Sequence, residues 1–279
     1  MAEYFLGEKR GELAVHKLYD RSITIKFDGR AHAYTWEEKG LFVPGVTKIL
    51  SRSAKEGLLP WASNTAADYV YNSLVANSTI GAVKDTDDIT VNIGELKRIC
   101  KEAKGAYRRV SKEAADIGKK VHKFAEQWLS GEQPGIPPEA DERIALGCEA
   151  FLRWLREHDV RPLIPEKVCF SKRWLYAGTC DFWGYIDGEL TVGDFKTSKA
   201  VYIDHLLQTA AYQVAIEEEL GVTVPARQLI RLDKTTGEFH VERHPHSNLH
   251  IDTFLSLRAY HEGLSKVELA RKNSGVSYD

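Results

Sequence analysis

The sequence lacks several features that would place it in a common class. It has four cysteines and no C-x-x-C pair, which argues against zinc ribbons, dithiol redox motifs and iron–sulfur clusters. It has no G-x-x-x-x-G-K-[ST] motif, so no nucleotide cofactor is expected. It also has no run of about 18 or more apolar residues and no signal-peptide pattern. These absences predict a cytoplasmic protein with no membrane partner.

The composition is that of a globular protein with a substantial core, because 43% of its residues are hydrophobic and 28% are charged. The formal net charge of −2 gives no sign of a nucleic-acid partner. Between Lys97 and Lys123, however, ten basic residues stand against three acidic ones. This excess could follow a phosphate backbone, although on charge alone a solvated helix face explains it equally well. The nearness of His122 favours DNA contact, for which the candidates are Arg108, Arg109, Lys112 and Lys119.

The most informative residues lie on either side of an Asp-Gly pair. Two strand-like runs flank Asp187-Gly188, the strongest short-range signal for a two-residue β-hairpin. Facing residues in such a hairpin have sequence numbers with a constant sum, so Asp181 is expected directly opposite Asp194. Their Cβ atoms would be about 5 Å apart. Lys196, two residues beyond Asp194, would point to the same face.

This arrangement predicts a metal site suited to phosphate chemistry. Two carboxylates that face each other destabilise a hairpin unless a cation lies between them, and hard divalent ions prefer such oxygen ligands. Asp and Lys are also common on solvated hairpin faces. Here, however, the face is otherwise apolar, and an unpaired charge on it would destabilise the folded protein by an amount on the order of several kcal/mol. The apolar residues that share it are Trp183, Tyr185, Leu190 and Val192.

Hydrophobic periodicity predicts a mixed sheet flanked by helices, an α/β (α+β) fold. Strands are expected at 23–27, 32–36, 164–174, 179–186, 189–196, 227–232 and 238–243. Helices are expected after a turn at 43–50, at 61–75, at 94–129 with a break near Gly105 or Ser111, and at 139–158, 204–220 and 247–272. A polar stretch at 77–92 is expected to be a mobile loop. The predicted parts are an N-terminal hairpin plus helical lobe (1–130), a core (131–272) and a tail (273–279).

Four short motifs then occur in a characteristic order. They are Gly118…His122, Gly178-Thr179-Cys180-Asp181, Asp194-Phe195-Lys196 and Gln208…Tyr212. With the segments 43–50 and 59–62 they cover about residues 43–212, and the set resembles the PD-(D/E)XK nuclease superfamily. It is most similar to the RecB-like exonuclease branch, which includes phage and mitochondrial exonucleases. Cys180 stands where the superfamily's name has a proline.

The resemblance implies a restriction-endonuclease-like core and a deoxyribonuclease dependent on one or two Mg²⁺ or Mn²⁺ ions. Asp181 and Asp194 would bind the metal, and Lys196 would position the attacking water and help neutralise the phosphate. His122 would assist the metal or the scissile end. Gln208 and Tyr212 would contact DNA or orient the site.

One further metal candidate enters through the same resemblance. Glu166 is similar to an additional acidic ligand of the family, but an expected turn near 175–178 does not bring it opposite Asp181, so it is the weaker metal candidate. Lys199 is a further candidate for DNA contact. The cysteines of the iron–sulfur members are absent.

The function expected from these features is that of a metal-dependent DNA exonuclease in phage or bacterial recombination, repair or DNA processing. A recombination or single-strand-binding protein would be a suitable partner, and a phage-encoded protein would act in the host cytoplasm. Two alternatives stay open: a structure-specific or restriction-type endonuclease, and a non-catalytic nucleic-acid-binding protein with the same fold. The motifs do not distinguish single-stranded from double-stranded substrates.

Overall fold

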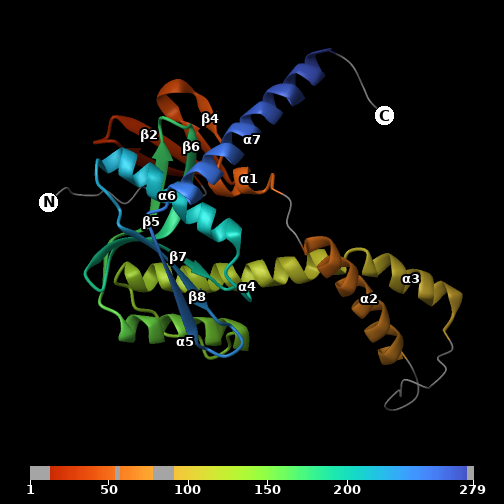
Figure 1. Cartoon of the computed structure of the whole chain (residues 1–279). Helices are drawn as coiled ribbons and strands as arrows, with labels where there is room; N and C mark the ends of the chain where they lie inside the picture. The colour runs from red at the N-terminus through yellow and green to blue at the C-terminus, as the bar shows by residue number, and fades with distance from the viewer. Residues whose placement is uncertain (1–12, 54–56, 78–90, 275–279) are drawn as a thin grey trace. The chain divides into compact units, whose positions relative to one another are not determined.

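The computed structural model describes residues 13–53, 57–77 and 91–274 (Figure 1). The chain forms two compact units, of which one runs to Ser53 and resumes at Lys120, and the other is Ala54–Lys119. The predicted division near residue 130 differs from this one, because the N-terminal strands pack onto the predicted core. Most of the predicted loop (78–90) and of the predicted tail (275–279) lies outside the described residues.

The N-terminal part of the first unit is a four-stranded antiparallel sheet in sequential order. The predicted hairpin at 23–27 and 32–36 is confirmed, with Ile25 paired to Trp36 and Asp28 to Ala33. The two outer strands were not predicted. The elements are β1 (Leu13–Leu18), β2 (Ile23–Asp28), β3 (Ala33–Trp36), a 3-10 helix (Glu37–Lys39), β4 (Leu41–Val43) and α1 (Val46–Leu50).

The larger sheet has five strands in the order β5-β6-β7-β8-β9. β5, β6 and β7 form an antiparallel meander, β8 pairs parallel to β7, and β9 pairs antiparallel to β8. The predicted mixed sheet is therefore confirmed. The strands are β5 (Val160–Ser171), β6 (Tyr176–Ile186), β7 (Glu189–Lys196), β8 (Ala226–Leu232) and β9 (Phe239–Pro245).

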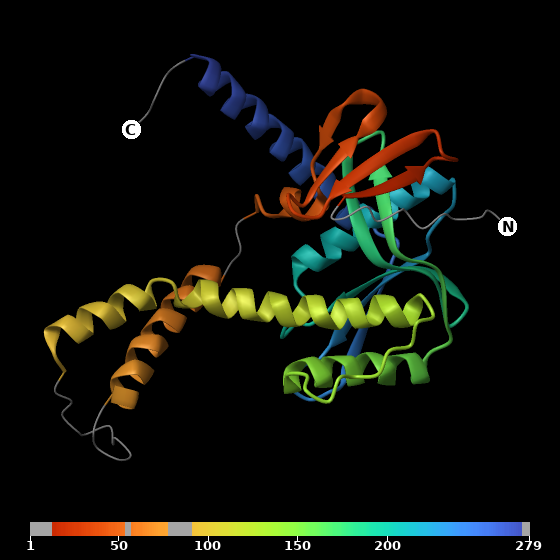
Figure 2. The ribbon, with the colours of Figure 1, turned by 180° about the vertical axis from the view of Figure 1, so that it is seen from behind.

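Helices cover both faces of this sheet, which confirms the predicted α/β class. α4 and α5 lie side by side in front of the strands in Figure 2, and Gly147 of α5 leaves room for Val121 of α4, because an added Cβ would lie 2.7 Å from Val121 Cγ2. The Phe151 and Trp154 rings of α5 both meet Phe195 of β7, with centroids 5.4 Å apart. Besides α1, the α-helices in the described part of this unit are α4 (Ala106–Leu129, from residue 120), α5 (Glu142–Glu157), α6 (Ile203–Leu220) and α7 (Asn248–Ser274).

The opposite face of the sheet packs against α1, α6 and α7. Trp183 of β6 and Val192 of β7 are buried there in one apolar cluster with Leu207 of α6 and Phe254 of α7. α6 connects β7 to the parallel strand β8 and ends at Gly221, whose φ of 65° allows the left-handed cap. The long helix between two parallel strands is what brings the α6 side chains over the ends of β6 and β7.

The small sheet packs onto the outer half of the β5–β6 hairpin. Ile25, Tyr34 and Trp36 share a buried cluster with Phe170 and Ala177 of that hairpin. The backbone is joined there as well, because Ala177 N donates to Pro44 O at 3.1 Å. These contacts place β1–β3 beside the middle of β5 and β6, where Glu166 and Asp181 lie.

The second unit is helical, with α2 (Leu58–Asn77), α3 (Ile93–Ala103) and the first part of α4. The predicted break near Gly105 is confirmed, because α3 ends at Ala103 and α4 begins at Ala106. Tyr69 Oη donates to Glu102 Oε2 at 2.6 Å and ties α2 to α3. Among the helices in the described ranges, none combines the length and apolarity that crossing a membrane requires.

Candidate active site

The β6–β7 turn forms as the sequence predicts. Asp187 and Gly188 have φ values of 52° and 80°, the left-handed conformation that a two-residue type I′ turn requires. Asp187 also accepts a hydrogen bond from Asp159 N at 2.8 Å and pairs with His158 Nδ1 at 2.6 Å. The hairpin pairing runs from Ile186–Glu189 to Phe182–Gly193. Continued by one residue, this register sets Asp181 against Asp194, so the predicted register is confirmed.

Asp181 lies where β6 ends its pairing with β7, and two elements hold its carboxylate. Oδ2 accepts a hydrogen bond from the backbone N of Phe195 at 2.8 Å. His122 of α4 places Nδ1 3.3 Å from the same oxygen. The structure therefore brings His122 to the predicted carboxylate from a helix that is distant in sequence. The Asp181 side chain keeps 18% of its surface exposed, so the site opens to solvent.

Lys196 connects Asp194 to α6. Its Nζ is in contact with Asp194 Oδ2 and donates to Gln208 Oε1 at 2.8 Å. Gln208 Nε2 donates in turn to Tyr212 Oη at 2.7 Å. The structure thus assembles Asp194, Lys196, Gln208 and Tyr212 in one chain of polar contacts. Gln208 and Tyr212 are one turn apart on α6, as their spacing predicts.

The two carboxylates have different electrostatic environments. Burial raises the pKa of Asp194 to about 6, with the Asp181 charge adding to the shift and Lys196 opposing it. Burial also opposes ionisation of Asp181, but His122 and Lys196 together hold its pKa below the ordinary value. The pKa of His122 is raised in spite of burial, because Asp181 favours the imidazolium. Asp181 and His122 therefore behave as an ion pair beside a carboxyl group that ionises less readily.

The expectation that Glu166 does not lie opposite Asp181 was wrong. The β5–β6 turn occupies residues 172–175, about three residues before the expected position. Pro165 pairs with Phe182 and Lys167 with Cys180, so Glu166 lies level with Asp181. Its φ of 47° is left-handed, which is uncommon for a non-glycine residue inside a strand. Glu166 thereby joins the wall of a pocket beside the site rather than the regular ladder.

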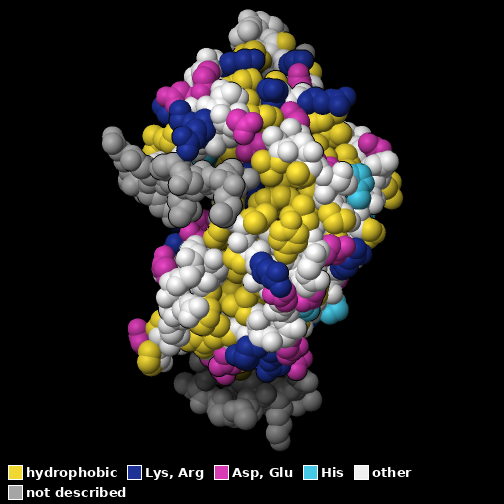
Figure 3. Space-filling view, turned by 90° about the vertical axis from the view of Figure 1, so that its left-hand side faces the viewer, with side chains coloured by type: hydrophobic (Ala, Val, Ile, Leu, Met, Phe, Trp, Pro, Cys, Tyr) yellow, Lys and Arg dark blue, Asp and Glu magenta, His cyan; other side chains and the backbone are white. Residues whose placement is uncertain are grey.

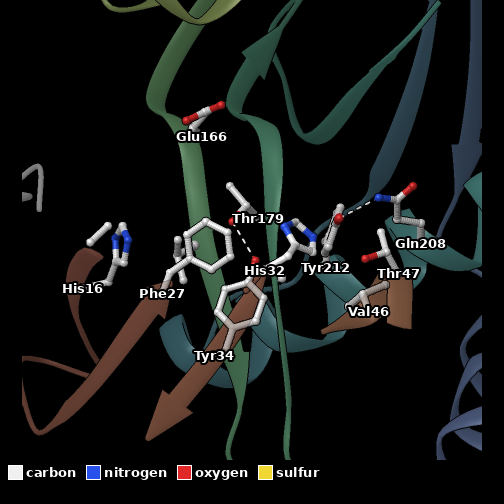
Figure 4. A pocket seen from close by; sticks show the side chains of 13 residues that line it. His16, Phe27, His32, Tyr34, Val46, Thr47, Glu166, Thr179, Gln208 and Tyr212 are labelled. Atoms are coloured by element: carbon white, nitrogen blue, oxygen red, sulfur yellow. Dashed lines mark hydrogen bonds between the residues drawn. The ribbon is translucent and has the colours of Figure 1, made fainter. Parts of the chain in front are cut away.

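This pocket has a volume of about 420 Å³ and lies beside the chain of polar contacts that runs from Asp194 to Tyr212. Figure 4 shows Gln208 and Tyr212 at one end, the aromatic side chains of β2 and β3 in the middle and Glu166 above them. Tyr34 Oη and Thr179 Oγ1 are 3.1 Å apart and fix part of the wall. Sequence reasoning missed the pocket, because its walls come from segments more than a hundred residues apart.

Of the residues predicted to contact DNA, the basic ones are exposed, whereas Gln208 is partly buried and Tyr212 is buried. Arg108, Arg109, Lys112 and Lys119 lie on α4 within the second unit, and Lys199 lies in the loop after β7. Arg109 stacks over Tyr69, with 4.9 Å from Cζ to the ring centroid. Elsewhere in the basic stretch, Arg98 is paired with Glu95 and Glu102. Figure 3 shows hydrophobic side chains at the centre of one face, with charges of both signs around them.

The donor set suits a hard divalent ion that keeps part of its water shell. Within residues 13–53, 57–77 and 91–274, no three His, Cys, Asp or Glu side chains form a ready-made metal cluster. Mg²⁺, however, is typically bound by one or two carboxylates together with water and substrate phosphate. Asp194 Oδ2 is buried, and its cationic partner in the structure is the Lys196 ammonium.

No family model matches this sequence, and no curated protein does. Among solved structures, the chain is similar to a protein from Eubacterium rectale that is provisionally named an exonuclease. The TM-score is 0.39 at 11% sequence identity, over 58% of this chain and 69% of that one. A likeness of this size identifies no function.

Proposed function

We propose that this chain is a Mg²⁺- or Mn²⁺-dependent deoxyribonuclease that acts at DNA ends. One observation carries the proposal: the type I′ turn sets Asp181 against Asp194, with Lys196 in contact with the second carboxylate. Facing carboxylates with an ammonium beside them suit the hydrolysis of a phosphodiester. The resemblance of the ordered motifs to the RecB-like branch supports the choice of an exonuclease.

Asp181 and Asp194 would hold the metal, with Glu166 as a further carboxylate on the neighbouring strand. A bound divalent ion would supply Lewis-acid activation and a water of lowered pKa. Lys196 places its positive charge where negative charge develops on the phosphate. Gln208 orients Lys196 through the 2.8 Å hydrogen bond, and the Tyr212 hydroxyl holds the Gln208 amide by accepting its Nε2 hydrogen. His122 orients the Asp181 carboxylate.

The biological setting that fits this activity is DNA recombination, repair or processing in a phage or bacterium. Substrate ends there arise at breaks and during strand exchange. A recombination protein or a single-strand-binding protein would be the natural partner in the cytoplasm. The exposed basic residues of α4 and Lys199 would hold the DNA backbone.

A comparison of DNA forms tests the proposed activity. End-labelled linear DNA and covalently closed circular duplex are each incubated with Mg²⁺, Mn²⁺ or EDTA, using the wild-type protein and Asp194→Asn. We expect progressive degradation of linear DNA with either metal, intact circles, and no hydrolysis in EDTA or by the variant. Nicking of circles that depends on metal and on Asp194 would instead establish an endonuclease. Binding without hydrolysis in any metal would establish the non-catalytic alternative.

Lys196 should matter for turnover more than for DNA affinity. Lys196→Ala removes a charge placed at the reacting phosphate, so we expect the rate to fall by about 100-fold or more while DNA still binds. Single-turnover hydrolysis and a binding titration measure the two effects separately. Lys266→Ala on α7 is the matched control, because it removes a lysine whose side chain is 75% exposed. Hydrolysis by Lys196→Ala at the rate of this control would remove Lys196 from the mechanism.

A further inference from the structure

The pocket beside the carboxylates has the size and position of a substrate subsite. Its volume of about 420 Å³ lies in the range of roughly 300–1,000 Å³ that is usual for small-ligand sites. Three of its lining residues belong to or adjoin the candidate active site, namely Gln208, Tyr212 and Glu166. Gln208 accepts the hydrogen bond from Lys196, and Glu166 lies level with Asp181. A group seated in the pocket would therefore be next to the scissile phosphate.

Aromatic rings form the middle of the wall. The ring centroids of Phe27 and Tyr34 are 4.8 Å apart, and those of Phe27 and His32 are 5.4 Å apart (Figure 4). Phe27 is half-buried, packing partly against the core of the small sheet, and His32 is exposed, so neither ring is fully buried. Ring faces of this kind bind flat heterocycles by stacking, with little dependence on the identity of the base.

The charged groups in the wall favour a base over a phosphate group. Neither Lys nor Arg is present among the described residues that line the pocket, whereas Glu166 contributes a carboxylate. A phosphate there would face the Glu166 charge, and its only possible cationic partners among the described lining residues would be the protonated forms of His16 and His32. A nucleobase carries amino and imino hydrogens that Glu166, Thr179 and the oxygen of the Gln208 amide can accept. The nitrogen of that amide can donate a hydrogen to an acceptor on the base.

We propose that this pocket receives an unpaired nucleobase of the strand being cleaved, so that the substrate is single-stranded DNA or an unpaired end. This inference rests on the proposed nuclease function and gives its substrate class. A base in a duplex must unpair and unstack to enter the pocket, because there one of its faces stacks on protein rings rather than on the neighbouring bases. The phosphate next to that base then lies at the Asp181–Asp194 pair.

Binding of a fluorescent single-stranded oligonucleotide in EDTA tests the pocket without turnover. Phe27→Ala should weaken binding by roughly five- to 100-fold, the range for the loss of one stacked base, and Phe27→Leu should weaken it nearly as much. Phe42→Ala is the matched control, because Phe42 lies on the same small sheet with 63% of its surface exposed and outside the pocket. Thermal melting establishes that each variant is folded, and Phe27→Leu keeps the test open if Phe27→Ala does not fold.

Abasic nucleotides near the strand end supply the second arm. Removing the bases should weaken binding to the wild-type protein as much as Phe27→Ala does, and should have little further effect on that variant. Equal affinity for normal and abasic strands, or for single strands and blunt duplex, would overturn the pocket assignment even if hydrolysis depends on metal and Asp194. Base-dependent binding by a protein that hydrolyses nothing would keep the pocket and overturn the nuclease.

Discussion

At the scale of single residues, a glycine is required at position 178 because the Tyr212 ring of the candidate site packs directly against it. A Cβ at this position would lie 2.5 Å from Tyr212 Cε1 and 3.1 Å from Val46 Cγ2. Gly178→Ala should therefore displace Tyr212 and, through it, Gln208. We expect a loss of about 1–3 kcal/mol in the free energy of unfolding, typical of an overpacked core, together with a lower rate of hydrolysis. Urea denaturation and single-turnover assays measure the two effects.

The double variant Gly178→Ala, Tyr212→Leu is the control for this prediction. The smaller side chain makes room for the added methyl group, so stability should recover while activity stays low without the Tyr212 hydroxyl. Wild-type stability and activity in Gly178→Ala alone would show that Tyr212 is free to move away at no cost.

The sequence predicted the residues of the site where a local signal was strong. Asp181 and Asp194 face each other because Asp187-Gly188 determines the register of the hairpin. Glu166 was misplaced because the turn at 172–175 contains neither glycine nor proline, and a three-residue error at a turn changes which residues face each other.

At the scale of elements, a buried ion pair connects β5 to α6. Lys167 Nζ lies 2.9 Å from Glu219 Oε2, and the two side chains are only 3% and 5% exposed. Lys167→Met should leave the Glu219 charge buried without its partner, and we expect a loss of about 3–5 kcal/mol in the free energy of unfolding. Urea denaturation measures this loss.

The paired replacement Lys167→Met, Glu219→Leu separates the ion pair from its burial cost. Both charges are then absent and the site is filled by apolar groups, so most of the stability should return. If the single variant is as stable as the wild-type protein, water reaches Glu219 and the pair contributes little.

The exposed basic residues of α4 should contribute to nonspecific DNA affinity. Replacing Arg108, Arg109 and Lys112 together by Ala should weaken binding to all sequences. It should also reduce the slope of log K against log salt by about 0.7–0.9 for each DNA phosphate that the variant no longer neutralises. Titrations at several salt concentrations measure the slope. An unchanged slope would assign this helix face to solubility alone.

At the scale of the whole molecule, His261 should make stability depend on pH. Burial, with Arg52 and Arg258 adding to it, lowers the pKa of His261 below its ordinary value of 6.5. The unfolded chain therefore takes up a proton near pH 6.5 that the folded protein does not. The free energy of unfolding is unaffected above that pH and falls as the pH drops from there to the lowered pKa.

Urea denaturation of His261→Gln and wild-type protein at about pH 7.5 and 5.5 tests this sign. The wild-type protein should lose more stability between the two values than the variant does. The difference between the proteins isolates His261 from Asp194 and His122, whose raised pKa values act in the opposite direction. A larger loss in the variant would contradict the prediction.

The fold class could be predicted from sequence because each helix and most strands have their own periodicity. β1 and β4 were missed because they are short and partly exposed, at six and three residues. The pocket was missed for a different reason: Phe27, Thr179 and Gln208 meet only after two sheets and α6 have packed. Hydrophobic periodicity describes single elements and does not predict which residues of different elements come into contact.

The Asp187–Gly188 turn also affects the chemical ageing of the chain. Asp-Gly peptides age when the glycine nitrogen attacks the side-chain carboxyl carbon of the aspartate and water leaves. Hydrolysis of the resulting cyclic imide at the main-chain carbonyl then places the side-chain methylene carbon in the backbone. In this turn, bonds from His158 and Asp159 lower the Asp187 pKa and keep its carboxylate ionised and held, and an ionised carboxylate is a poor electrophile. Folding therefore protects a linkage whose rearrangement would lengthen the turn by one backbone atom and disturb the alignment of Asp181 with Asp194.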